Sequence, residues 1–394
     1  MLNKLLSYGN RHFNIEEKVG QINDGRERPQ IPTSDISRAV LTMMLSNLGS
    51  LNRLGAAASL GSIYTPSIST IARSADTMDL EAIREILKEI YLVARKKKMI
   101  GDICGRSVGI LDGHEVTSSY IHKCDHCRTR NVSKIDETVK LQYYHSFVAF
   151  ILAGEKFATM LDIEPILPGQ GELTSAYRLL ERVCINYPKA FNAVAGDALY
   201  LAGEIFNLLK SHRKYCIAVL KDEKRQLYEE AVALSDIADP IVYKNNNTAY
   251  RVWEHKIEGL WDSYKGEVTV IRSKETKAVA DTEVKADWMW VTNLPSTGNL
   301  RNMVRICHSR WQIENQCFNE MVNIWTLDHI YRHRANAILV FILFLFIAVN
   351  IVNVFFNRNI KDARIKTKVF LLDLVKASLL LNRRRALPPN PIPI

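Results

Sequence analysis

The stretch SVGILDGHEVTSSYI, residues 107–121, decides how the sheet of this protein begins. A short apolar run ends at Asp112, a glycine follows, and a second run rich in β-forming residues continues to Ile121. We predict a hairpin here, with its turn after Asp112. The apolar stretch YYHSFVAFILAGEK, residues 143–156, then predicts a third strand.

Helices and strands alternate after these three strands. Apolar residues recur at helical spacing in residues 171–184 and residues 202–212, whereas residues 191–200 and residues 214–221 contain short apolar runs that predict strands. Three strands before the first helix favour a mixed sheet over an all-parallel one. We therefore predict an α/β fold with a mixed sheet flanked by helices.

The sequence pattern divides the chain into five parts. An N-terminal helical region for DNA binding or dimerisation is followed by the first part of the sheet domain, a β-rich insertion with alternating polar and apolar residues, a return to helices, and a basic extension that ends in LPPNPIPI. The predicted boundaries are 1–100, 101–221, 222–296, 297–356 and 357–394.

One segment is long enough to cross a bilayer: AILVFILFLFIAVNIVNVFF, residues 337–356. Asn350 and Asn353 interrupt its second half, and the rest of the chain offers no partner span. Helices that are apolar all round also occur in the cores of large soluble proteins. We expect a buried core helix and no membrane partner, with a single membrane span as the alternative.

The composition is that of a basic globular protein. The 394 residues include 52 Lys and Arg against 42 Asp and Glu, and this excess favours, weakly, a polyanionic partner such as nucleic acid. Seven scattered cysteines do not form a disulfide framework, and the N-terminus does not have the pattern of a signal peptide. Both features predict a reducing, intracellular setting.

Three carboxylates are candidates for catalysis. Asp112 and Asp197 each close an apolar run, and Glu314 follows Arg310 by one helical turn in RWQIENQCFNE, residues 310–320. Taken singly, the aspartates suit turns or helix caps, and Glu314 suits an exposed ion pair with Arg310. Taken together, three carboxylates could bind two divalent cations that promote phosphodiester displacement.

GILDGHEVTSSY, VAGDALY and RWQIENQCFNE resemble, in this order, the three acidic motifs of bacterial cut-and-paste insertion-sequence DDE transposases. The resemblance covers about residues 100–355. It implies an RNase H-like fold with a β insertion, and it implies Asp112, Asp197 and Glu314 as ligands of two Mg²⁺ ions, which Mn²⁺ could replace. Arg310 is implied to be a phosphate or carboxylate partner beside them.

The resemblance also implies the reaction and the partners. An endonuclease step would hydrolyse one strand at the transposon end, and the freed 3′ hydroxyl would then attack the opposite strand and later the target DNA. The implied partners are double-stranded transposon ends and target DNA, bound by a homodimer in the bacterial cytoplasm near the nucleoid. Arg301 and Arg305, just before Arg310, are further candidate DNA contacts.

The last motif departs from the family pattern at two positions. Cys307 and Met321 stand where the family has a Tyr and a Lys that are implied to contact DNA phosphates. Three alternatives stay open: a metal-dependent nuclease of the same fold without strand transfer, a DNA-binding relative without activity, which the missing Tyr and Lys favour, and a membrane-anchored basic protein, which rests only on residues 337–356.

The tryptophans of the predicted insertion are candidates for stacking on a DNA base. Trp253, Trp261, Trp288 and Trp290 lie in the predicted insertion, where the family implies an aromatic that stacks on a flipped base, although a tryptophan in a strand is more often part of the core.

Cys124 and Cys127 form a CxxC beside His122 and His126. The two thiols could supply half of a Zn²⁺ site with an imidazole as third ligand, but the missing second pair favours a turn with free thiols. His114, close after Asp112, is expected to be a hydrogen-bonding surface residue on the turn.

Overall fold

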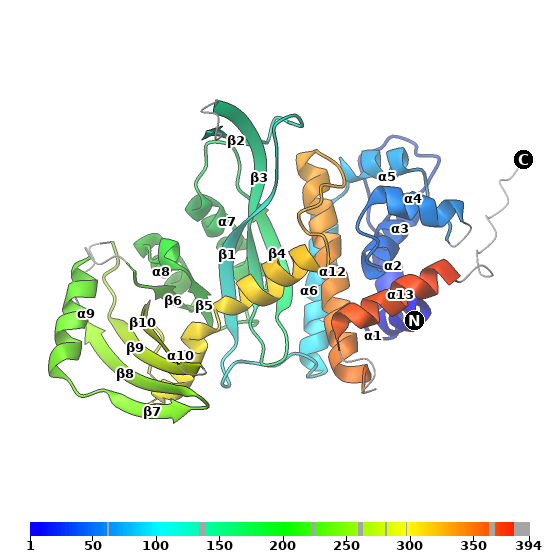
Figure 1. Ribbon diagram of the computed structural model, residues 1–394. Helices are drawn as coiled ribbons and strands as arrows, with labels where there is room; N and C mark the ends of the chain where they lie inside the picture. Colours follow the sequence, from blue (N-terminus) through cyan, green and yellow to red (C-terminus); the bar gives the residue numbers. More distant parts are fainter. Residues whose placement is uncertain are drawn as a thin grey trace, which may run out of the picture.

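The computed structural model describes residues 1–60, 63–133, 139–221, 225–258, 263–279, 282–296, 298–361 and 367–381. Within these ranges ten strands form one sheet in the order β2-β3-β1-β5-β6-β10-β9-β8-β7, with β4 paired to β3 (Figure 1). The strands are β1 (Val108–Ser119), β2 (Arg128–Ser133), β3 (Val139–Leu152), β4 (Thr159–Pro165), β5 (Ala193–Gly196), β6 (Tyr215–Val219), β7 (Ile241–Asn245), β8 (Thr248–Ile257), β9 (Val268–Val279) and β10 (Thr282–Thr292).

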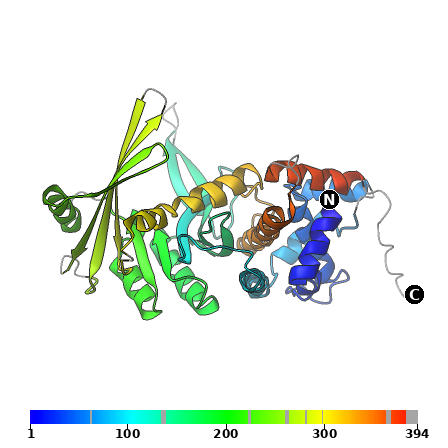
Figure 2. The ribbon, with the colours of Figure 1, turned by 90° about the horizontal axis from the view of Figure 1, so that it is seen from below.

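Helices lie on both faces of the central strands. Other helices, from the N-terminal part of the chain, form a separate layer beside them (Figures 1 and 2). The first group is α1 (Leu2–Phe13), α2 (Ile15–Gly20), α3 (Thr33–Leu45), α4 (Leu51–Ser59), α5 (Ile68–Ala75) and α6 (Leu80–Lys96). The others are α7 (Glu172–Asn186), η1 (Ala198–Tyr200), α8 (Gly203–Ser211), α9 (Gln226–Ile237), α10 (Leu300–His308), η2 (Ile313–Asn319), α11 (Glu320–Asn323), α12 (Ala335–Asn359) and α13 (Lys368–Leu381).

Both parallel and antiparallel pairs occur in the sheet. β1 pairs with β5 and β5 with β6 in parallel, whereas β3 runs antiparallel to β1 and β10 antiparallel to β6. The prediction of an α/β fold with a mixed sheet flanked by helices is confirmed.

The alternation of side chains along the strands separates two apolar cores. Ile110 of β1 and Ile151 of β3 belong to the core under α6 and α12, while Leu111 and Phe150 belong to the core under α7 and α8. Successive residues of a strand point to opposite faces, so every second residue of these strands serves the same core. This rule also fixes the face on which each polar side chain at a strand end projects.

The predicted hairpin in residues 107–121 is wrong. β1 runs without a break from Val108 to Ser119, and Asp112 and Gly113 lie inside it, opposite Ala149 and Val148 of β3. Gly113 is needed for space rather than for a turn. A Cβ at this position would come within 2.3 Å of a carboxylate oxygen of Glu172, so a larger residue would displace that side chain.

Three strands were not predicted: β2, β4 and β7. β4 is buried although it contains Asp162 and Glu164, because arginines from two helices pair with these acids. Asp162 accepts hydrogen bonds from Arg84 Nε of α6 at 3.0 Å and from Arg182 Nε of α7 at 2.7 Å. Paired in this way, a buried carboxylate is tolerated in a central layer of the protein.

The strands of residues 222–296 continue the sheet of the core. β10 pairs with β6 through Trp290, Val291 and Thr292, and the long β9–β10 hairpin carries β8 and β7 beyond it. α9 packs on the outer strands of this extension (Figure 1).

α12 is a core helix. It is the one helix among the described residues that is long and apolar enough to cross a membrane, and its most apolar window is entirely buried inside the protein. Asn350 fits this burial because its side-chain amide bonds both backbone groups of Met160 on β4, at 2.9 and 2.8 Å. Asn353 accepts a hydrogen bond from Lys368 Nζ of α13 at 3.1 Å. The prediction of a buried core helix is confirmed.

Candidate active site

Asp112 lies inside β1, and Asp197 directly follows the last residue of the neighbouring parallel strand β5. The register pairs Ile110 of β1 with Ala195 of β5, and Asp112 and Asp197 each lie two residues further along the chain, in extended backbone. Adjacent strands are only about 4.8 Å apart, and both side chains project from the same face of the sheet. Asp197 also caps η1 through a hydrogen bond from Leu199 N–H at 2.8 Å.

The environment of Asp112 opposes its ionisation. Its side chain is 17% exposed. Burial first, and then the negative charge of Asp197, raise the pKa of Asp112 to about 7, while Arg310 and the Gly113 N–H act in the opposite direction. A carboxyl group with a pKa so far above its ordinary value beside a second carboxylate is typical of sites that need a cation or a proton to be stable.

Arg310 joins the third acid to this pair. Its Nη1 lies 2.8 Å from Glu314 Oε1 and 3.7 Å from Asp112 Oδ2. The two carboxylate oxygens are therefore at most about 6.5 Å apart, a spacing compatible with two bound ions about 3.5–4 Å apart. Arg310 is 9% exposed, so its pairing with Glu314 is more than the exposed ion pair that was the simpler reading.

Glu314 lies in the first turn of η2, which is a π-helix. π-helical turns are uncommon and occur frequently at functional sites. The Glu314 side chain is about half exposed, at 49%. It is therefore held near Asp112 through Arg310 on one side and is open to solvent on the other.

A further carboxylate, Glu172, was missed by the sequence analysis. It is the first residue of α7, it fills the space left by the missing Cβ of Gly113, and its Oε1 accepts a hydrogen bond from the Tyr200 hydroxyl at 2.6 Å. Its charge adds to the forces that raise the pKa of Asp112. Gly113 was the feature of the sequence that could have indicated a close neighbour such as Glu172, but it was interpreted as part of a turn.

His114 holds η2 against β1. Its ring stacks on Phe318 of η2 with centroids 4.5 Å apart and planes at 17°, and its Nε2 lies 2.9 Å from Asp328 Oδ1. His114 was expected on a surface turn, but it lies within β1 and its side chain is only 18% exposed. It is a positioning residue for the helix that carries Glu314.

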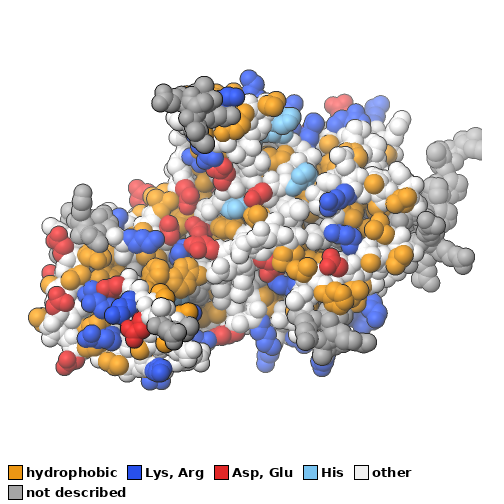
Figure 3. Space-filling view, in the orientation of Figure 1, with side chains coloured by type: hydrophobic (Ala, Val, Ile, Leu, Met, Phe, Trp, Pro, Cys, Tyr) orange, Lys and Arg blue, Asp and Glu red, His pale blue; other side chains and the backbone are white. Residues whose placement is uncertain are grey.

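The donors fit hard divalent cations. Carboxylate oxygens, the ligands that Mg²⁺ and Mn²⁺ prefer, are offered by Asp112, Asp197 and Glu314. A bound cation would also offset the negative charge that accumulates around Asp112. Figure 3 shows several acidic side chains near the middle of the face it presents. These residues are therefore suited to hold such ions.

The two positions that depart from the family motif are part of the core. Cys307 is 1% exposed and Met321 is fully buried. Neither position can present a side chain to a DNA phosphate in this fold, so the two departures from the motif are accommodated by packing.

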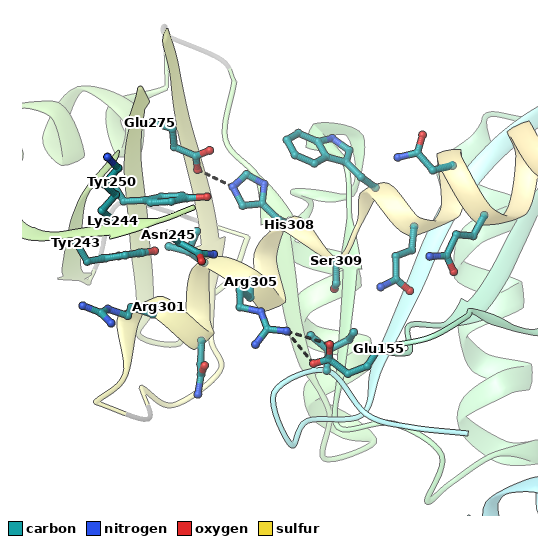
Figure 4. A pocket seen from close by; sticks show the side chains of 17 residues that line it. Glu155, Tyr243, Lys244, Asn245, Tyr250, Glu275, Arg301, Arg305, His308 and Ser309 are labelled. Carbon is teal, nitrogen blue, oxygen red and sulfur yellow. Dashed lines mark hydrogen bonds and ion pairs between the residues drawn. The ribbon is translucent and has the colours of Figure 1, made fainter. Parts of the chain in front are cut away.

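Arg301 and Arg305 line a different part of the surface from Arg310. With Tyr243, Tyr250 and further residues of α10 and η2 they surround an open cleft of about 640 Å³ between the outer strands and α10 (Figure 4). Arg301 lies over the ring of Tyr243 at 4.8 Å, and Tyr243 stacks on Tyr250 at 4.7 Å. Arg305 pairs with both oxygens of Glu155 at 3.0 Å. Neither Arg310 nor Glu314 lines this cleft.

The tryptophans of residues 222–296 are not equivalent. Trp253 and Trp290 are 5% and 3% exposed and belong to the core, whereas Trp261 lies outside the described residues. Trp288 is half-buried, and its ring meets Trp311 at 4.9 Å. Trp311, which the sequence analysis did not single out, is also half-buried and lines the cleft.

Cys124 and Cys127 lie together in the connection between β1 and β2. Both thiols are free and their sulfur atoms are 3.7 Å apart. The imidazoles that lie against them are those of His145 and His333, far along the chain, whereas the sequence neighbours His122 and His126 are exposed.

No model of a protein family matches the chain, and no curated protein matches it.

Proposed function

We propose that the protein is a DDE-type DNA transposase that cuts and joins DNA at the ends of an insertion sequence. The observation that carries the proposal is that one buried arginine, Arg310, links Glu314 to Asp112, whose other acidic neighbour is Asp197, with the three acids in the order of the three acidic motifs. The mixed sheet, with added strands between Asp197 and Glu314, supports the proposal, which implies an RNase H-like fold.

Each residue has a distinct task in this proposal. Asp112 and Asp197, fixed on adjacent strands, would hold two Mg²⁺ ions from the sheet side, and Glu314 would complete the ligand set from η2. Bound there, the ions would polarise the scissile phosphodiester and favour ionisation of the attacking hydroxyl. Arg310 keeps Glu314 within reach of Asp112 and limits the repulsion among the acids.

The basic residues of the cleft supply a second contact with DNA. Arg301 and Arg305 of α10, together with the Tyr243–Tyr250 stack and Trp311, offer cations and aromatic faces on the other side of the helical segment that carries Glu314. Cations bind phosphates without regard to sequence, and aromatic faces accept unpaired bases. This cleft suits a displaced strand or a flipped nucleotide at the DNA end.

The test uses the full-length protein and a labelled duplex that carries the inverted repeats flanking its gene. With Mg²⁺ or Mn²⁺ we expect nicking at the repeat end and joining of the freed 3′ end to a second DNA. Asp197→Asn should abolish both reactions and leave salt-sensitive DNA binding intact, because the basic residues remain. Glu204→Gln, which removes an exposed carboxylate in the first turn of the next helix, is the matched control.

The outcomes separate the alternatives. Cleavage without joining would make the protein a nuclease of the same fold, and DNA binding without cleavage would make it an inactive relative. Cleavage that survives Asp197→Asn would remove the assignment of the acids.

A further inference from the structure

Four side chains of types that bind metals come from three separate segments of the chain and meet at one place. Cys124 and Cys127 come from the β1–β2 connection, His145 from the middle of β3, and His333 from the loop before α12. Their ligand atoms all lie within 4.8 Å of one another. We refer to these four residues as the Cys₂His₂ cluster.

Five of the six distances inside the cluster are close to the edges of a tetrahedral zinc site, and the sixth is at most 4.8 Å. The two sulfur atoms are 3.7 Å apart, and the two Nε2 atoms are 3.2 Å apart. His145 Nε2 lies 3.4 Å from Cys124 Sγ and 3.3 Å from Cys127 Sγ, and His333 Nε2 lies 3.1 Å from Cys127 Sγ. Zinc with Zn–S bonds of about 2.3 Å and Zn–N bonds of about 2.0–2.1 Å requires edges of about 3.8, 3.4 and 3.5 Å for S–S, N–N and S–N.

We propose that the Cys₂His₂ cluster binds one structural Zn²⁺ ion. Two thiolates and two imidazoles form a complete ligand set for zinc, with all four positions supplied by the protein, as in structural sites. The Cys124 N–H donates a hydrogen bond to Cys127 Sγ at 3.2 Å, the kind of outer contact that stabilises a ligating sulfur. Cys127 and His145 are 8% and 9% exposed, so the centre is largely shielded from water.

Hydrogen bonding within the cluster does not explain this arrangement. The two Nε2 atoms face each other and both also face Cys127 Sγ, so three groups compete for very few protons. Thiols are weak hydrogen-bond partners in any case. A cation at the centre would instead accept one lone pair from each of the two sulfur atoms and each of the two imidazole nitrogens.

The ion would fasten the loop that follows the candidate active site. His333 lies in residues 324–334, the connection between α11 and α12, and the same connection contains Asp328, the partner of His114. Zinc at the cluster therefore ties this connection to β3 and to the β1–β2 turn. The proposal does not depend on the proposed DNA chemistry, because the cluster is separate from the three acids.

The experiment measures metal content of the purified full-length protein by mass spectrometry after dialysis against metal-free buffer. We expect one zinc per chain, and we expect the Co²⁺-substituted protein to show the intense visible absorption of a tetrahedral site together with thiolate-to-cobalt charge transfer. His333→Asn and Cys127→Ser should lose zinc and this spectrum. Cys104→Ser, at a free thiol outside the cluster, should keep both.

His122→Asn and His126→Asn decide between this assignment and the one that sequence proximity suggests. Both variants should retain zinc, since their imidazoles are exposed and outside the cluster. Zinc lost from His126→Asn but kept by His333→Asn would overturn the assignment. So would wild-type protein that takes up no zinc after reduction and incubation with ZnCl₂, or a disulfide between Cys124 and Cys127 that forms in place of metal binding. The wild-type measurement decides even if a variant fails to fold.

Discussion

Asp112 and Asp197 each lie two residues beyond the Ile110–Ala195 pair of two adjacent parallel strands, and the charge of Asp197 raises the pKa of Asp112. No backbone movement is needed to bring their carboxylates together, because the register has already done so. The repulsion between them is therefore a permanent property of the metal-free fold, and its effects should be measurable without any DNA.

The first prediction concerns pH. The pKa of Asp112 is raised from 3.8 to about 7, so the folded protein binds a proton between these values that the unfolded chain has released. The free energy of unfolding should then fall as pH rises from about 4 to about 7, by up to about 4 kcal/mol. Asp112→Asn should be more stable than the wild type at pH 8 and nearly equal to it at pH 4.

Thermal melts across this pH range, without added Mg²⁺ and without chelator, give the comparison. Added Mg²⁺ should stabilise the wild type at pH 8 and leave Asp112→Asn unchanged. Equal melting temperatures at pH 8 would show that burial and the charge of Asp197 do not raise the pKa of Asp112.

The second prediction concerns His114. Its stack on Phe318 and its bond to Asp328 position η2, so His114→Ala should lower the rate of metal-dependent cleavage by about tenfold, or about 1.4 kcal/mol. His114→Phe keeps a stacking ring and should recover part of the rate. An apparent Mg²⁺ affinity that falls along with the rate identifies misplacement of Glu314 as the cause.

The third prediction concerns Asn350, a polar residue in the most apolar helix. Asn350→Leu should destabilise the protein by about 2–4 kcal/mol, because both backbone groups of Met160 lose their partner inside the core. Denaturant titration measures the loss. Ile351→Leu, a volume-conserving change on the next residue, should cost less than about 1.5 kcal/mol. A membrane span would respond in the opposite way, since leucine is favoured in lipid.

The fourth prediction concerns the aromatic wall of the cleft. Trp311→Ala should weaken binding to DNA with an unpaired base at its end by about 1–3 kcal/mol and leave binding to fully paired DNA unchanged. Trp253→Phe is the control, because Trp253 is a core residue whose Nε1 bonds Ala238 O. Equal losses for paired and unpaired ends would exclude a stacking role for Trp311.

The parts of the fold that follow from local pattern could be predicted from the sequence. The apolar periodicity of α6 predicts a helix packed on a core, and the long apolar run of α12 predicts a helix whose two asparagines favour burial in the protein over a membrane span. β2 escaped prediction because RTRNVS is mostly exposed and has no apolar face. β4 was not predicted because its two acids are typical of surface residues. Only the fold shows that Arg84 and Arg182 lie beside them and allow their burial.

The candidate sites show the same limit. The acids at 112, 197 and 314 were found because each belongs to a recognisable local motif, whereas Glu172 belongs to none and is brought in by the space above Gly113. His145 and His333 could not be assigned to Cys124 and Cys127 because sequence spacing favours the nearer His122 and His126. Long-range packing selects among chemically identical side chains, and a single sequence does not encode that choice locally.

The pairing of β10 with β6 has a mechanical consequence. Because β6 also pairs with β5, the outermost strands are joined to Asp197 by an unbroken ladder of hydrogen bonds rather than by a flexible hinge. A ligand bound at the outer edge of this sheet is therefore held at a fixed distance and angle from the carboxylates. If the reaction requires bending, the ligand and not the sheet must deform.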